Sequence, residues 1–202
     1  KPMRHAAIKT LALAALALPL AALAHTGADA GSHHHGFAAG FMHPLTGVDH
    51  LAAMVAVGLW SALAARRAWP DLLWAPLAFA GMLLAGALMG LAGLQLPAVE
   101  PMIAASLLVL GLLVATRIQL PVGVAVSVIG LFAVFHGVAH GQELAGEHGA
   151  ALTLAGMVAA TLLLHAAGIA VGWALRHANA WLPRVAGAGV VALGVTLLAQ
   201  AA

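Results

Sequence analysis

Histidine and carboxylate side chains recur at two places in an otherwise apolar chain. The first is the segment 43–50, which reads HPLTGVDH, and the second is the segment 136–143, which reads HGVAHGQE. In the second segment, steps of four and three residues place two histidines and a glutamate on one face of a helix. Imidazole and carboxylate groups together favour nickel, cobalt, zinc or copper(II), whereas magnesium and calcium prefer oxygen ligands. The candidate ligands of a divalent metal ion are therefore His43, Asp49, His50, His136, His140 and Glu143.

Two more ionisable residues interrupt apolar stretches, and both extend this candidate site. Glu100 opens such a stretch from the same side as the two histidine segments. His165 stands about 16 Å along a helix from Arg176, which places it close to the middle of a bilayer. Charged residues inside a span cost about 2.5–3.5 kcal/mol on insertion scales, so each is expected to have a partner or a function. Asp49 has an alternative role as a helix cap, because Thr46 and Asp49 have the spacing of a capping box.

The composition indicates a membrane protein and excludes several kinds of site. Of 202 residues, 63% are hydrophobic and 7% are charged, and the mean hydropathy is +1.04. Cysteine is absent, which excludes disulfides, thiolate metal sites and iron–sulfur clusters. Lysine occurs only at Lys1 and Lys9, so the chain has no Walker A lysine for nucleotide hydrolysis. The basic residues are scattered and form no patch of the kind that binds nucleic acid.

Apolar stretches of membrane-spanning length follow one another along the chain. Each is close to the roughly 20 residues that a helix needs to cross a bilayer. We therefore predict an all-α protein with a bundle of six transmembrane helices in the domain 44–202. The six predicted spans are 44–65, 71–93, 99–116, 120–141, 150–174 and 184–201.

The first 24 residues have the features of a cleavable signal peptide. Three basic residues precede the apolar run Leu11–Ala24, which ends in small residues typical of a cleavage site. Cleavage there makes His25, a further candidate metal ligand, the first residue of the mature chain and leaves 25–43 as an external segment rich in histidine and glycine. Within it, His33–His35 either collects metal or is of engineered origin.

The arginines after the leader predict the orientation of the bundle. If the mature N-terminus is outside the cell, the connections that carry these arginines all lie in the cytoplasm, as the positive-inside rule requires. The predicted location is thus the inner, or plasma, membrane of a bacterial-type cell, with an external N-terminus. The residues concerned are Arg66, Arg67, Arg117, Arg176 and Arg184.

The residues resemble those of the HupE/UreJ family of hydrogenase- and urease-associated nickel/cobalt permeases. The resemblance covers nearly all of the mature chain. It depends on the leader followed by HTG at 25–27, and on the segments GFMHPLTGVDHL at 40–51, EPMIAAS at 100–106, FHGVAHGQE at 135–143 and LHAAG at 164–168. It implies a six-helix permease whose His43, Asp49 and His50 match the family's metal motif in the first helix.

From these features we expect a secondary permease that takes up Ni²⁺, or Co²⁺ as the second choice, for hydrogenase or urease maturation. The ion is cargo, so no permanently bound cofactor is expected, and Zn²⁺ is not distinguished from nickel by ligand type alone. The partners implied are a divalent ion, lipid and the maturation proteins of those enzymes. We do not expect an enzyme, although the same residues allow a zinc-dependent intramembrane hydrolase that uses Glu143 or Glu100. A haem protein with paired histidines and a purely structural protein are further alternatives.

Overall fold

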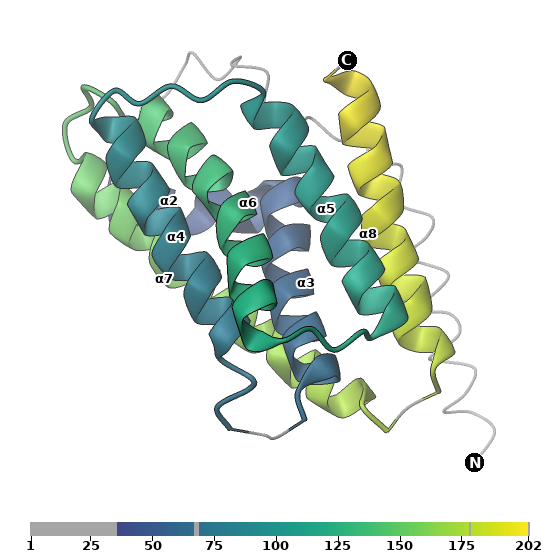
Figure 1. Ribbon diagram of the computed structural model, residues 1–202. Helices are drawn as coiled ribbons and strands as arrows, with labels where there is room; N and C mark the ends of the chain where they lie inside the picture. Colours follow the sequence, from purple (N-terminus) through teal and green to yellow (C-terminus); the bar gives the residue numbers. More distant parts are fainter. Residues whose placement is uncertain (1–35, 67–68, 178, 202) are drawn as a thin grey trace.

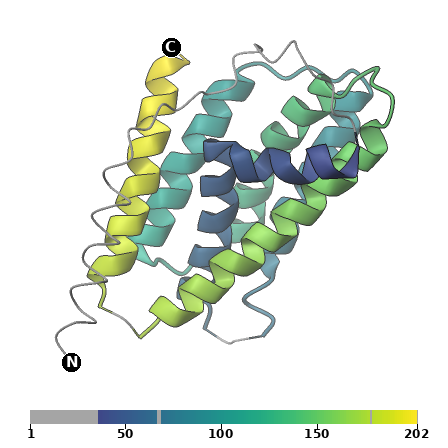
Figure 2. The same ribbon diagram turned by 180° about the vertical axis from the view of Figure 1, so that it is seen from behind.

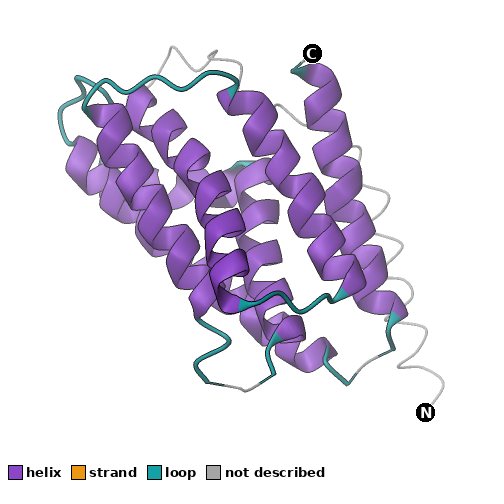
Figure 3. Ribbon diagram, in the orientation of Figure 1, coloured by secondary structure: helices purple, strands orange, loops and turns teal. Residues whose placement is uncertain are grey.

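The computed structural model describes residues 36–66, 69–177 and 179–201, and these residues form seven helices and no strand (Figures 1 and 3). The helices are α2 (Phe37–Thr46), α3 (Val48–Ala64), α4 (Trp74–Leu91), α5 (Val99–Thr116), α6 (Val122–Glu143), α7 (Ala150–Leu175) and α8 (Trp181–Gln200). The predicted signal peptide, His25 and His33–His35 lie outside the described residues. An all-helical architecture is therefore confirmed.

Helices α4 to α8 are each long and apolar enough to cross a membrane, and α2 and α3 together make a sixth candidate span that is bent by 81°. The bend is at Gly47, whose extended backbone, with φ −73° and ψ 112°, interrupts the helix. The first predicted span, 44–65, therefore begins too early, because Pro44–Thr46 still belongs to α2. The other five predicted spans correspond closely to α4 to α8.

Helix α2 crosses the bundle almost at right angles to α3 and packs along α7 (Figure 2). The backbones of α2 and α7 approach each other closely. A side chain at Gly40 would collide with the carbonyl of Thr153, and one at Gly156 would collide with the carbonyl of Phe37. The backbone N–H of Gly36 also donates a hydrogen bond of 3.0 Å to Thr153 Oγ1. Helix α2 was not predicted, and its packing on α7 fixes the position of His43.

Close glycine contacts also join α4 to α6 and α3 to α7, the two helix pairs that position the remaining histidines. Gly137 and Gly141 of α6 lie against the carbonyls of Leu83 and Ala87 in α4. Gly168 of α7 lies in the same way against the carbonyl of Val55 in α3. Such small-residue contacts let helix backbones approach each other in lipid. These contacts pair α4 with α6 and α3 with α7.

The described arginines gather at one end of the bundle, where α3, α5 and α7 end and α8 begins (Figure 1). Arg117 Nη2 donates a hydrogen bond of 3.1 Å to the carbonyl of Arg176, and Arg176 in turn donates to the carbonyl of Ala65. The guanidinium of Arg184 stands over the ring of Trp181 at 5.4 Å. Basic side chains thus satisfy carbonyl groups at helix C-termini, where cations are favoured.

Candidate metal site

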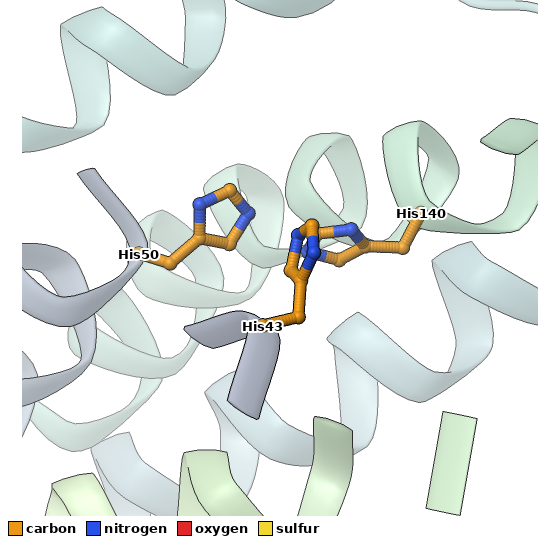
Figure 4. A group of neighbouring side chains, drawn as sticks. All are labelled: His43, His50 and His140. Atoms are coloured by element: carbon orange, nitrogen blue, oxygen red, sulfur yellow. The ribbon is translucent and has the colours of Figure 1, made fainter. Parts of the chain in front are cut away.

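Three histidines from three different helices meet away from the arginine end. Figure 4 shows that His43 of α2, His50 of α3 and His140 of α6 point toward one another. One ring nitrogen from each lies within 4.8 Å of the other two. The ring centroids are 5.4 Å apart for His43 and His50, 4.9 Å for His43 and His140, and 4.6 Å for His50 and His140. The fold thus brings the two predicted segments, 43–50 and 136–143, into one cluster.

Asp49 and His50 lie in the first turn of α3, directly after the break at Gly47. Asp49 Oδ1 lies 2.9 Å from His50 Nδ1. The alternative capping role of Asp49 is wrong, because the N-cap of α3 is Gly47 and no side chain forms a capping hydrogen bond there. Thr46 still belongs to α2, so its hydroxyl donates to the carbonyls of Met42 and His43 and does not cap α3.

His136 lies one turn before His140 on α6 and is completely buried. Its ring centroid is 5.4 Å from that of His50. His136 Nε2 is 3.1 Å from Ser106 Oγ on α5. His136 therefore extends the cluster toward the interior of the bundle.

Glu143 ends α6 at the outer edge of the cluster. Its Oε2 lies 3.5 Å from His140 Nδ1, and the side chain keeps 54% of its surface exposed, whereas His140 keeps only 2%. The predicted helical face with His136, His140 and Glu143 is thus present. It runs from a buried imidazole to a carboxylate in contact with solvent.

His165 of α7 is buried deeper in the bundle and faces the backbone of α3. Its Nδ1 lies 2.8 Å from the carbonyl oxygen of Met54. Because a carbonyl oxygen only accepts hydrogen bonds, Nδ1 carries the proton and Nε2 carries the lone pair. The ring of Phe79 contacts both His165, at a centroid distance of 5.2 Å, and His136, at 5.6 Å. Phe79 therefore connects the cluster to His165.

Four of these imidazoles share one arrangement. On each ring one nitrogen faces an oxygen atom, from Asp49, Ser106, Glu143 or the Met54 backbone. The other nitrogen is buried and has no hydrogen-bond partner: His50 Nε2, His136 Nδ1, His140 Nε2 and His165 Nε2. The contacts of His50 Nδ1 and His140 Nδ1 with Asp49 and Glu143 are close ion-pair contacts without hydrogen-bond geometry. A buried polar atom without a partner costs about 1–3 kcal/mol. Histidines that bind metals usually hold their second nitrogen against a carboxylate or carbonyl in this way, so the arrangement suits a divalent ion.

The sequence model of the HupE / UreJ protein family matches residues 13–197. The chain belongs to the HupE/UreJ family. It is 43% identical over 192 residues to Protein HupE of Rhizobium leguminosarum bv. viciae, and this alignment covers 94% of the chain and 96% of that relative. No solved structure matches. The family that the sequence resembled is thus the family to which it belongs.

The group of three histidines in this HupE/UreJ protein does not include the predicted ligand Glu100. Glu100 is exposed in the first turn of α5 and is not one of the grouped side chains. Conversely, sequence reasoning assigned no role to Ser106, Phe79 or the carbonyl of Met54. A lone serine or phenylalanine in an apolar helix has no spacing that marks it, and a backbone carbonyl leaves no signal in sequence.

Proposed function

We propose that this HupE/UreJ protein is a secondary permease that takes up Ni²⁺, or Co²⁺ as the second choice, across the inner membrane. The observation that supports this most strongly is the set of buried imidazole nitrogens without a hydrogen-bond partner on His50, His136, His140 and His165. Nitrogen donors backed by carboxylates suit borderline divalent ions. The delivered metal then serves hydrogenase or urease maturation proteins in the cytoplasm.

Capture occurs at the carboxylate-bearing edge of the cluster. Glu143 is exposed there and attracts the hydrated dication, while Asp49 supplies a second negative charge beside His50. The ion exchanges water for imidazole nitrogens as it enters. Because His43 comes from α2 and the other ligands come from α3 and α6, binding requires these three helices to hold their present arrangement.

Transfer proceeds inward past Phe79 to His165. Met54, whose carbonyl holds His165, is four residues below His50 on α3, a rise of about 6 Å. The second station is therefore about one helical turn from the first, and the Phe79 ring, which contacts His136 and His165, lies between them. A path with a second donor below the first favours transport over hydrolysis, which needs a closed pocket for a substrate.

The membrane potential is sufficient to drive uptake in this direction. Moving a dication inward across an inside-negative membrane is favourable by about 4.6 kcal/mol per 100 mV. Uptake driven by the membrane potential needs no nucleotide hydrolysis, and this chain has no Walker A lysine.

Metal uptake into proteoliposomes tests the proposal. The purified protein should admit Ni²⁺ under an inside-negative potential, and comparison with Co²⁺ and Zn²⁺ gives the selectivity. His50→Ala and His140→Ala should each lower the initial rate at least about tenfold, as loss of a ligand or its support does. His177→Ala is the matched control, because this exposed histidine lies in the connection after α7 and should leave the rate unchanged. Wild-type rates in both cluster variants would reject the assignment.

A further inference from the structure

The hydroxyl of Ser106 lies between a backbone carbonyl and the ring of His136. Ser106 Oγ is 2.6 Å from the carbonyl oxygen of Ile103, one turn earlier on α5, and 3.1 Å from His136 Nε2 on α6. Both Ser106 and His136 are fully buried, with 0% of their surface exposed. The proposed capture step gives this contact between α5 and α6 no role.

Counting protons decides which group donates in this contact. The carbonyl of Ile103 has no proton and can only accept, so the single hydroxyl proton of Ser106 points toward it. The alternative would leave two oxygens 2.6 Å apart with no proton between them. Ser106 Oγ then accepts a hydrogen bond, and the only donor available from the imidazole is the proton on Nε2. His136 therefore carries its proton on Nε2 and its lone pair on Nδ1.

We propose that Ser106 is a positioning residue that fixes the tautomer of His136, so that Nδ1 serves as a fourth imidazole ligand beside His43, His50 and His140. His136 Nδ1 is buried and has no hydrogen-bond partner, and its ring packs edge to face against that of His50. In the opposite tautomer, Nδ1 would carry the proton and have no lone pair to offer a metal ion. This inference rests on the proposed transport of a divalent ion through the cluster.

The proposal also explains a difference among the four histidines. His50 and His140 face carboxylates, whereas His136 faces a hydroxyl and His165 faces a backbone carbonyl. A carboxylate partner strengthens an imidazole ligand and adds charge, and a neutral partner only orients it. The strength with which the imidazoles bind the metal thus decreases inward along the path. This decrease lets an ion leave the capture cluster toward the cytoplasm.

The first test measures the tautomer in the metal-free protein. In nitrogen-15 NMR spectra of histidine-labelled protein in lipid, the signal lost in His136→Asn should have Nε2 protonated and Nδ1 unprotonated. In Ser106→Ala the same ring should become a mixture of both tautomers. A wild-type ring protonated on Nδ1, or a Ser106→Ala spectrum identical to wild type, would overturn the proposal.

The second test measures Ni²⁺ affinity by calorimetry on the purified full chain. Ser106→Ala should raise the dissociation constant about 10- to 100-fold, the usual cost of losing a partner that orients a ligand. Ser106→Thr, which keeps the hydroxyl, should restore affinity to within a few-fold of wild type. Ser61→Ala is the matched control, because this buried hydroxyl also donates to a carbonyl, that of Leu72, but lies near the arginine end. Equal affinities in the two alanine variants would contradict the proposal.

X-ray absorption of the Ni²⁺-loaded protein adds a readout that packing alone would not change. The wild type should show one more imidazole around nickel than Ser106→Ala. If the wild type binds no Ni²⁺, the proposed function fails, but the NMR measurement still decides whether Ser106 fixes the tautomer. The two proposals can therefore fail separately.

Discussion

Asp49 combines two roles in the proposed capture site. Its Oδ1 is 2.9 Å from His50 Nδ1, and this close contact restricts the orientation of the ring. It also places a negative charge next to the bound dication, where few other charges are available. A neutral amide can keep the orientation of the ring, but it cannot replace the negative charge.

Exchange of this carboxylate for an amide separates the two roles. Asp49→Asn should lower Ni²⁺ uptake at least about tenfold, because an isolated dication in a site of low dielectric loses a strong Coulomb partner. Asp49→Ala should reduce it further, since His50 then also loses its orientation. Initial rates at equal protein abundance measure both effects. Glu147→Gln, in the connection between α6 and α7, is the matched control and should keep the wild-type rate, whereas a normal rate in Asp49→Asn would show that charge is not needed.

The break between α2 and α3 is the element that assembles the cluster. Gly47 stands where His43, Asp49 and His50 approach one another. A methyl group on it would lie 3.2 Å from His50 Nδ1, 3.3 Å from Asp49 Oδ1 and 3.4 Å from the carbonyl oxygen of His43. Because its φ of −73° suits any residue, the requirement for glycine is one of space and not of backbone conformation.

Gly47→Ala should therefore impair metal binding more than folding. The added methyl pushes the Asp49–His50 pair away from His43, and we expect a loss of Ni²⁺ affinity of about tenfold or more by analogy with other supporting residues. Calorimetry measures the affinity, and a thermal melt in detergent measures stability. Gly81→Ala on α4 is the control, since nothing lies within 4 Å of its added methyl. An unchanged affinity in Gly47→Ala would mean that the break tolerates a side chain.

Elements of this fold differ in how far sequence predicts them. Helices α4 to α8 were predicted because continuous apolar runs of sufficient length leave one stable arrangement in lipid, with every backbone group bonded internally. Helix α2 was missed because it is only ten residues long, contains Pro44, and depends on α7 far along the chain. Pairing of the helices could not be predicted, since glycine spacing marks a close contact without naming its partner.

For the candidate site too, features within one helix could be predicted from the sequence, and contacts between helices could not. The ligand types and the face that carries His136, His140 and Glu143 follow from residue spacing within one helix. Contacts between helices do not, so the roles of Ser106 and Phe79 entered only with the structure. Glu100 is exposed in the first turn of α5, and its role as a ligand stays a prediction.

Over the whole molecule, the two ends of the bundle differ in chemistry. The clustered histidines, with Asp49 and Glu143, lie toward one end, while the described arginines lie at the other, together with Asp71 and His177 (Figure 1). The positive-inside rule predicts that the arginine end lies in the cytoplasm. With that orientation the exposed carboxylate of Glu143 faces the outside, the side from which the proposed permease captures its metal.

Because the chain has no cysteine, single introduced cysteines can report this orientation without background. Ala145→Cys lies in the exposed connection after α6, and His177→Cys lies in the exposed connection after α7, at the arginine end. A maleimide that does not cross membranes should label Ala145→Cys in intact spheroplasts and His177→Cys only after lysis. Both variants should retain Ni²⁺ uptake, since neither residue contacts the cluster. The reverse labelling pattern would place the histidine cluster on the cytoplasmic side, and the same ligands would then have to serve export, with Glu143 collecting ions from inside the cell.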